Sequence, residues 1–366
     1  MTTATDVDAK RSADELAAKE LPDNLGAANP YVLAEVKLGR KVNWRRTPHP
    51  HEILEQALGM PYEDLFDPRK KSPLFAGKEV KKNGKTERSE APVEVSSLVW
   101  SDPGEFFYEA AEFFDPVQGA VGDCYLIAAL SSIAWARPYL IANRTRATGA
   151  NQQDFVDMIE VHDAGKTVQV EVTEKLPLNA PGNTYIFCRS SETGEIWPAI
   201  YEKAYAKWRT HVTTDTPDIN AIAGGDPVAA LAQLTGLTPY YYGNPSMTPD
   251  AIWTKVRENS VSRKTINPMV AWTYCSPPAG INYGDAHIAG CHAYSILGWL
   301  YDNGKEYIVL RNPWGFFEAT LNVDSGSYVA YDGSFWRTIN LMNNDGTFAL
   351  EAPTFQKYFA GFGLVK

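Results

Sequence analysis

The stretch that decides the fold is Gln-Gly-Ala-Val-Gly-Asp-Cys-Tyr at residues 118–125, which runs directly into the apolar segment 126–135. The glycines predict a loop, and the apolar run predicts a buried helix that begins near Cys124. A cysteine at a helix start is favoured as a thiolate, because backbone N–H groups and the helix dipole stabilise negative charge there. The alternative is a small buried residue that only opens a core helix. Cys124 is therefore a candidate nucleophile that needs partners elsewhere in the chain.

The bulk composition indicates a folded, acidic protein. The chain has 366 residues, of which 44% are hydrophobic, so we expect two core-forming lobes and some tail. A net charge of −10 argues against partners such as nucleic acid or anionic membranes. The chain start lacks signal-peptide features, and no run approaches the roughly 18 apolar residues of a membrane span. We expect a cytoplasmic protein without membrane insertion, although export as an effector stays open.

The four cysteines are spread widely along the chain, which does not suggest a disulfide framework. Three regions are expected. Residues 1–95 form a polar N-terminal extension, partly disordered, with a candidate regulatory role and short helices at 9–21 and 51–58. Residues 96–224 form a first lobe with the cysteine, and residues 225–366 form a second, β-rich lobe. The boundary follows from the Gly-Gly pair that precedes residue 226.

A hairpin in the second lobe brings two more polar residues together. Two strand-like runs flank Asn303 and Gly304, and Asn-Gly is the strongest short-range hairpin signal. If the turn centres on this pair, His292 and Asn312 lie near the same open end of the hairpin. Alone, His292 would be a core histidine and Asn312 a turn former. Together they place an imidazole beside an amide.

These residues supply the parts of a nucleophilic site. A cysteine nucleophile needs a base, and the imidazole of that base needs a third group to fix its orientation and tautomer. Cys124, His292 and Asn312 are those three types of residue. The amide of Gln118 could join the Cys124 backbone N–H as an oxyanion hole.

The same motifs resemble the calpain-like cysteine proteases. The resemblance rests on residues 118–124, on Cys-His-Ala-Tyr-Ser at 291–295 and on Arg-Asn-Pro-Trp-Gly at 311–315, and it is collinear from about Ser101 to the C-terminus. It implies an α+β, two-lobed papain-like fold, with a helical Cys lobe and an antiparallel-sheet His/Asn lobe. It also implies a catalytic set in which Trp314 shields the bond between the histidine and the asparagine.

The catalytic roles follow from the resemblance. Cys124 would attack the peptide carbonyl, His292 would protonate the leaving amine, Asn312 would orient His292, and Gln118 would stabilise the oxyanion. Two positions depart from the family pattern: Cys291 replaces a glycine, and Tyr125 replaces a tryptophan. We expect Cys291 to be a small residue that fills a core position.

The resemblance also raises the question of calcium. No cofactor is needed for the chemistry, but calcium is a candidate activator. Asp115 and Glu202 match ligands of a first calcium site, and Glu318 and Asp345 match ligands of a second. A second-site glutamate is replaced at Thr347, and calcium prefers six to eight oxygens, so the first site is favoured. An arginine that couples the lobes is also replaced, at Phe113, and strict calcium activation is not expected.

The leading hypothesis is a cysteine endopeptidase that performs limited proteolysis of protein or peptide substrates. The alternatives are a catalytically silent calpain-like binding protein, and an acyl transferase or isopeptidase on the same fold. No segment fits an EF-hand calcium loop, so we expect a catalytic core without that module. The sequence leaves substrate preference and oligomeric state open.

Overall fold

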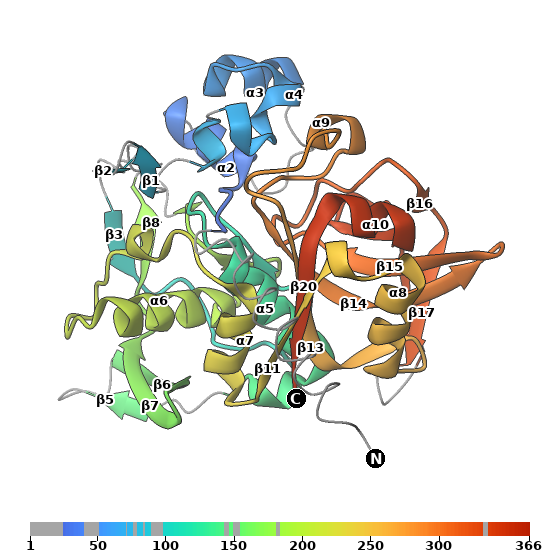
Figure 1. The fold of residues 1–366 in the computed structure, drawn as a ribbon. Coiled ribbons are helices and arrows are strands. Elements are labelled where there is room, and N and C mark those ends of the chain that lie inside the picture. Colours follow the sequence, from blue (N-terminus) through green and yellow to red (C-terminus); the bar gives the residue numbers. More distant parts are fainter. Residues whose placement is uncertain are drawn as a thin grey trace.

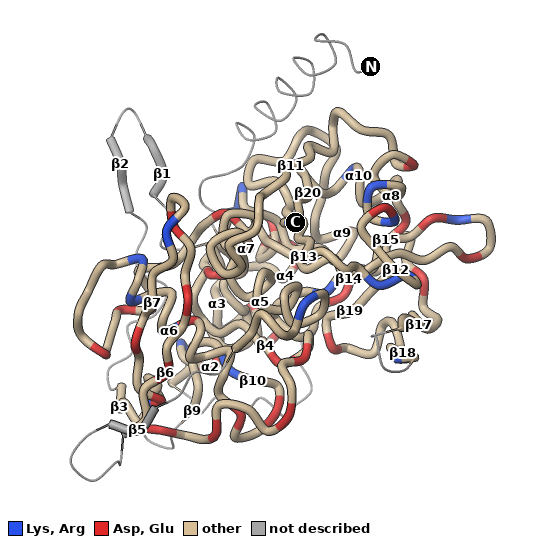
Figure 2. The backbone as a smooth tube through the Cα atoms, turned by 90° about the horizontal axis from the view of Figure 1, so that it is seen from below, with Lys and Arg blue, Asp and Glu red and all other residues tan. Residues whose placement is uncertain are grey.

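The computed structural model describes residues 25–39, 51–70, 72–75, 79–82, 85–88, 98–142, 146–148, 154–180, 184–331 and 336–366. It is a mixed α+β structure in which a helix-rich part (residues 98–236) stands beside an antiparallel sheet part (residues 239–366) (Figure 1). None of the described helices is long and apolar enough to cross a membrane. Lys and Arg form short, separated segments along the described chain (Figure 2).

Three helices and several short strands build the helix-rich part. Its helices are α5 (Cys124–Ala136), α6 (Trp197–Thr210) and α7 (Pro227–Thr235). Its antiparallel strands are β3 (Leu98–Ser101), β8 (Leu176–Asn179) and β9 (Thr184–Tyr185); β5 (Arg146–Thr148), β6 (Asp154–Asp163) and β7 (Lys166–Thr173); and β4 (Pro116–Val117) with β10 (Arg189–Ser190).

Helix α5 is the centre of this part. It begins at Cys124 and ends before Pro138, as the apolar run and the proline predict. Every residue from Cys124 to Trp135 is buried, which explains why the segment is apolar on all sides.

An eight-stranded antiparallel sheet dominates the other part (Figure 1). In spatial order its strands are β11 (Pro239–Gly243), β20 (Phe359–Val365), β13 (Lys264–Thr273), β14 (Ala293–Asp302), β15 (Lys305–Arg311), β19 (Thr347–Glu351) and β16 (Val323–Asp324), with β12 (Ser260–Val261) paired to β13. Strands β17 (Ser327–Tyr331) and β18 (Trp336–Asn340) form a separate hairpin. The helices here are α8 (Pro249–Glu258), α9 (Tyr283–Ala286) and α10 (Ala352–Tyr358). Single 3₁₀ turns among the described residues are η1 (Pro68–Lys70), η2 (Pro73–Phe75), η3 (Pro138–Leu140), η4 (Ile219–Ile222) and η5 (Asn244–Ser246).

The hairpin predicted around Asn303 and Gly304 is confirmed as β14–β15. Both turn residues have positive φ, 48° and 78°, which a tight two-residue hairpin turn requires. A register shift between Ile296 and Gly298 moves the pairing by one residue towards the open end. That end therefore carries the residues next to His292 and Asn312.

Helix α5 packs directly on β13 and β14 through side-chain to backbone hydrogen bonds. Ser295 Oγ donates to the Ala128 carbonyl at 2.7 Å, and Trp135 Nε1 donates to the Leu297 carbonyl at 2.6 Å. Ser132 Oγ makes a third bond, to a backbone carbonyl of β13 at 2.8 Å. The helix that begins with Cys124 is thus fixed to the strand that follows His292.

The N-terminal region contributes helices α2 (Pro30–Lys37), α3 (His51–Leu58) and α4 (Tyr62–Leu65) and strands β1 (Glu79–Lys82) and β2 (Lys85–Arg88). Helix α3 confirms the helix predicted at 51–58, whereas the one predicted at 9–21 lies outside the described residues. The three helices sit over the junction between the two parts of the molecule (Figure 1). Although the region is polar overall, Leu54, Leu65, Phe66 and Leu74 are fully or almost fully buried.

One expectation about the cysteines is wrong. Cys275 and Cys291 form a disulfide, so Cys291 is not simply a small residue in the core. Cys275 lies two residues after β13 and Cys291 two residues before β14, and the antiparallel pairing of these strands brings the two ends together. Cys124 and Cys188 are buried and take no part in a disulfide.

Candidate active site

Cys124 occupies the first position of helix α5, where the sequence places a candidate nucleophile. The loop before it is held from two sides. The Gly122 carbonyl accepts a bond from Gly224 N at 2.8 Å, and Gln118 N donates to the Pro313 carbonyl at 2.9 Å. The second bond joins the loop of the cysteine directly to the turn that follows Asn312.

His292 and Asn312 lie together as the hairpin predicts. His292 Nε2 and Asn312 Oδ1 are 2.9 Å apart, and both residues are fully buried. Asn312 Oδ1 also accepts from Trp314 N at 3.1 Å, and its Nδ2 donates to the Phe317 carbonyl at 3.0 Å. Because the amide nitrogen is committed to Phe317, the oxygen faces the imidazole. This orientation places the proton of a neutral His292 on Nε2 and leaves Nδ1 as the basic nitrogen.

Trp314 covers this hydrogen bond. Its ring centroid lies 4.4 Å from that of His292, and its side chain is almost completely buried. Phe66 of the N-terminal region packs on the same indole at 6.1 Å. A polar bond in so dry a setting is stronger than one exposed to water.

Tyr294 packs against the candidate histidine. Its ring packs edge-on against His292 with centroids 4.9 Å apart. Burial, with the neighbouring Cys124 as a smaller contribution, raises the pKa of the Tyr294 phenol. Tyr294 therefore packs against the His292 ring and lies within electrostatic range of Cys124.

Gln118 lies in the same region, fully buried, but its amide is engaged by the protein. Nε2 donates to the Val121 carbonyl at 2.7 Å and to the Ala27 carbonyl at 2.8 Å. The first bond keeps the side chain folded over the loop that leads to Cys124. The second bond goes to a residue of the N-terminal region, more than ninety positions earlier in the chain.

The sequence interpretation missed a residue that joins the two parts of the molecule. Arg311, at the end of β15, is almost completely buried and donates to the Pro116 and Phe114 carbonyls at 3.0 and 2.8 Å, and to Ser131 Oγ at 3.0 Å. Burial lowers the pKa of its guanidinium to about 10. The signal was an arginine that directly follows the apolar run 307–310 of the strand. A buried charge at such a position needs partners from elsewhere in the chain.

The two residues proposed for a first calcium site face different partners. Asp115 Oδ2 accepts from Glu112 N at 2.7 Å and from Trp197 Nε1 at 3.1 Å, whereas its buried Oδ1 has no hydrogen-bond partner among the described residues. Burial raises the pKa of Asp115 to about 7. Glu202 accepts from Cys188 N at 3.0 Å and faces the carboxyl of Asp123 instead.

Asp123 and Glu202 form a buried pair of acids directly before Cys124. Burial raises the pKa of Asp123 to about 7, and burial together with Asp123 raises the pKa of Glu202 well above its ordinary range. Two carboxyl groups this close do not both ionise readily, so the pair holds a proton.

The residues proposed for the second calcium site do lie together. Glu318 Oε1 accepts from Asp345 N at 2.8 Å and from Gly346 N at 3.1 Å, and Asp345 Oδ1 accepts from Thr347 N at 2.8 Å. Burial, and to a lesser degree Asp345, raises the pKa of Glu318. These carboxylates shape a tight turn whose backbone satisfies part of their hydrogen-bonding capacity.

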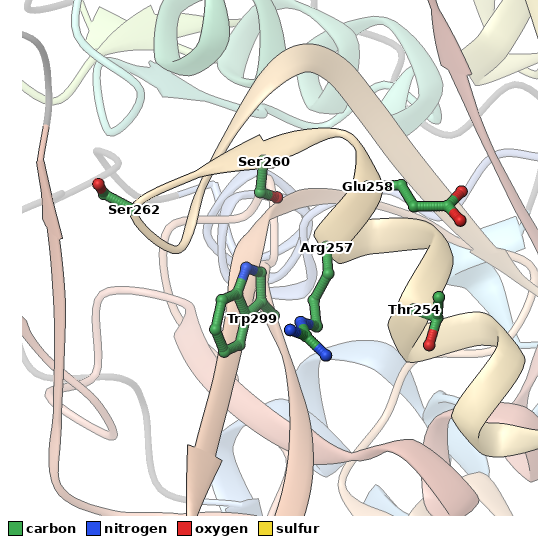
Figure 3. Close-up of a pocket in the computed structure, with 6 residues that line it drawn as sticks. All are labelled: Thr254, Arg257, Glu258, Ser260, Ser262 and Trp299. Carbon is green, nitrogen blue, oxygen red and sulfur yellow. The ribbon is translucent and has the colours of Figure 1, made fainter.

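Two other surface features lie outside the predicted site. Among the described residues, Glu109, Glu112 and Glu192 group closely enough to share a cation, and Glu112 adjoins Asp115. A separate pocket, shown in Figure 3, is lined by Thr254, Arg257, Glu258, Ser260, Ser262 and Trp299. Trp299 is seven residues along the strand from His292, roughly 20 Å away, so this pocket is distinct from the candidate active site.

Comparison with known proteins now identifies the class. Residues 62–365 match the model of the calpain family of cysteine proteases. This match includes the cysteine loop, the histidine strand and the asparagine turn. The chain belongs to the calpain family of cysteine proteases, whose catalytic domain has a papain-like fold.

Individual relatives support this family assignment. A thiol protease of Porphyromonas gingivalis is 33% identical over 66% of this chain and 53% of its own length. The human calpain-2 catalytic subunit is 25% identical over 72% of this chain and 37% of its own length. The chain thus matches between about a third and half of the length of these relatives. A solved NlpC/P60 endopeptidase from Photobacterium damselae is 10% identical over 57% of this chain and 45% of that chain, with a TM-score of 0.17, too low to support an argument.

Proposed function

We propose that this chain is a cysteine endopeptidase that makes limited cuts in protein substrates. The observation that carries the proposal is the 2.9 Å bond between His292 Nε2 and Asn312 Oδ1, buried beneath Trp314 and joined through the Pro313 carbonyl to the loop of Cys124. An oriented imidazole beside a cysteine at a helix start is what thiol catalysis needs.

The reaction follows from these positions. His292 Nδ1 takes the proton of the Cys124 thiol, and the resulting thiolate attacks the carbonyl carbon of the peptide bond. The C–N bond then breaks as Nδ1 transfers that proton to the leaving amine, and the acyl group stays on Cys124 as a thioester. His292 then removes a proton from water, which attacks the thioester, releases the carboxylic acid and restores the thiol. Asn312 keeps the imidazole in one orientation through both steps.

Gln118 is proposed to stabilise the oxyanion together with the Cys124 backbone N–H. Both groups belong to the same loop and helix start, and donors fixed before the reaction cost no reorganisation when charge develops. The amide reaches this role only when the Ala27 carbonyl no longer occupies one of its N–H groups.

The domain organisation is part of the proposal. We assign residues 96–224 and 225–366 to two lobes of a papain-like core, with the substrate cleft between them, and residues 1–95 to a modulatory extension. The packing of α5 on β13 and β14 supports a cleft at that boundary.

Calcium is proposed as a modulator, with Asp115 as its principal ligand. The buried Oδ1 of Asp115 suits a hard cation that prefers oxygen ligands, and Asp115 also accepts from the backbone N–H of Glu112, a member of the nearby cluster of Glu109, Glu112 and Glu192. When bound, calcium would supply positive charge that neutralises these acids. The second site is less suited, since backbone N–H groups already bind Glu318 and Asp345.

The deciding experiment compares hydrolysis of casein and of a fluorogenic peptide by the wild-type chain and by Cys124→Ala. We expect hydrolysis that disappears in the variant, while Cys188→Ala, which removes the other buried free thiol, retains it. Equal turnover by wild type and Cys124→Ala would refute the proposal. Transfer of the acyl group to an added amine in preference to water would instead favour an acyl transferase.

A further inference from the structure

Residues 25–29 form a short extended segment that is buried in the interior of the molecule. Leu25, Ala27 and Ala28 have no exposed surface, and Asn29 is only 1% exposed. Leu25 and Ala27 belong to the same apolar cluster as Cys124, Cys291 and Trp314. A segment near the start of the chain thus packs in the same core cluster as the candidate nucleophile.

The backbone of this segment is hydrogen-bonded to both parts of the molecule. Gly225 N donates to the Leu25 carbonyl at 3.0 Å, within an antiparallel bridge. Gly26 N donates to the carbonyl of Cys291, the residue before His292, at 3.1 Å. An extended peptide that enters a cleft is bound in the same way, through main-chain bonds to the edges on either side.

The segment also covers the loop that leads to Cys124. Asn29 N donates to the Gly119 carbonyl at 3.0 Å, and Asn29 Nδ2 donates to the Gln118 carbonyl at 2.9 Å. The Ala27 carbonyl takes one N–H of the Gln118 amide, the donor proposed for a substrate oxyanion. A carbonyl of the chain itself therefore occupies the place where a substrate carbonyl would be bound.

Gly26 is the residue that permits this close approach. A Cβ at position 26 would lie 2.4 Å from the Gly122 carbonyl oxygen and 3.1 Å from Gly224 N. Both neighbours are backbone atoms, so they are unable to give way as a flexible side chain would. No other residue fits at this position without displacing the segment.

The residues that follow hold the segment in place. Ala28 N donates to the Leu74 carbonyl at 2.8 Å, and Tyr31, at the start of α2, packs on Phe316 with ring centroids 4.3 Å apart. Figure 1 shows α2, α3 and α4 together over the junction of the two parts. This arrangement closes the region around His292 and Cys124, which are both fully buried.

We propose that residues 25–29 occupy the substrate cleft of the same molecule and block it as a tethered peptide. The inference rests on the proposed protease function and adds its regulation: a protein substrate reaches Cys124 only after this segment leaves. Release by displacement of the N-terminal region, or a cut within the segment by the enzyme itself, would both open the site.

The test measures access to Cys124 in the full chain. Gly26→Val forces the segment out, because its side chain collides with backbone, so we expect iodoacetamide to alkylate Cys124 at least about tenfold faster than in wild type. An increase in casein hydrolysis should accompany it, since the apparent rate scales with the open fraction. Mass spectrometry of peptide digests assigns the label, with Cys124→Ala as the blank.

Gly326→Val is the matched control. A Cβ at Gly326 would meet only the carboxylate of Asp324, at the end of a side chain on an exposed turn. In the Gly326→Val protein, the rates of Cys124 alkylation and of casein hydrolysis should equal those of the wild type. Leu25→Asp is a second displacing variant, because it puts a carboxylate into an apolar site. It replaces Gly26→Val in the test if circular dichroism shows that the Gly26→Val protein is unfolded.

A peptide with the sequence of residues 23–29 provides an independent measurement. Added to the Gly26→Val protein, it should inhibit hydrolysis in competition with substrate, and a scrambled peptide should not. Equal alkylation of wild type and both displacing variants, with no inhibition by the peptide, would overturn the inference. If hydrolysis stays Cys124-dependent in that case, only the blocking role fails, whereas fast alkylation without any hydrolysis would refute the protease function itself.

Discussion

Arg311 Nη1 donates a hydrogen bond to Ser131 Oγ at 3.0 Å and thereby ties the end of strand β15 to the middle of helix α5. The same guanidinium binds two backbone carbonyls of the segment that leads to the cysteine loop. One side chain from the sheet part therefore satisfies three acceptors in the helix-rich part.

Replacing Arg311 by Met should lower the free energy of unfolding by about 3 kcal/mol, because buried carbonyls lose a charged donor. The measurement is urea denaturation followed by fluorescence. Arg137→Met is the control, since Arg137 also bonds across to the sheet part, at Ile266 and Asn267, but lies in a more exposed position. It should cost less than about 1 kcal/mol, and equal losses in the two variants would contradict the role assigned to Arg311.

Asn312→Ala should lower kcat/KM for a peptide substrate by about 100-fold, because His292 loses the acceptor that orients it. Asn322→Ala, which removes a bond to Thr354, should leave kcat/KM unchanged. Asn312→Asp keeps the acceptor and adds a negative charge that favours the imidazolium, so the alkaline limb of the pH profile should move to higher pH. Wild-type kcat/KM in Asn312→Ala would show that the bond is only structural.

Gln118→Ala should lower kcat by about 100-fold while KM changes little, since the amide is proposed to act on the oxyanion rather than on the bound substrate. Alkylation of Cys124 should be no slower than in wild type, because the variant also loses the bond to Ala27. Gln356→Ala, which removes a bond to the Met247 carbonyl, is the matched control. A rise in KM with unchanged kcat would argue against an oxyanion role.

Asp115→Asn should stabilise the protein in chelator at pH 8 by about 2 kcal/mol. Burial raises the pKa of Asp115 from 3.8 to about 7, so the folded state holds a proton that the unfolded state releases, and stability falls as pH rises through this range. The side-chain amide of the Asp115→Asn variant does not ionise, so the variant does not lose this stability as the pH rises.

Calcium tests the same residue. If Asp115 is its principal ligand, millimolar calcium should raise the melting temperature of the wild type at pH 8 and leave that of Asp115→Asn unchanged. A similar rise in both proteins would place calcium elsewhere, and Glu318→Gln would then be the variant to examine.

The sequence predicts the parts of the fold that local pattern determines. Helix α5 follows from its apolar run and Pro138, and the hairpin β14–β15 follows from Asn303 and Gly304, whose backbone conformation the turn requires. The family motifs then predict the α+β class. These features depend on neighbours in sequence, so short-range reasoning reaches them.

What the sequence did not predict are contacts between distant residues. Cys275 and Cys291 meet only because two strands pair, and Arg311 finds its carbonyl partners in another part of the chain. Leu25 and Gly26 belong to a run too short to show any periodicity, within a region whose overall polarity suggested little burial. The role proposed for them depends on a cleft between two parts of the molecule that must both fold first.

The bonds between helix α5 and strand β14 have a consequence for activation. The helix that starts with Cys124 and the strand that follows His292 are held together by the hydrogen bond from Ser295 Oγ to the Ala128 carbonyl. These bonds would therefore keep the proposed nucleophile and base at a fixed spacing when the N-terminal region moves. Activation would then require only that residues 25–29 leave the site, because the proposed catalytic residues would already be in position.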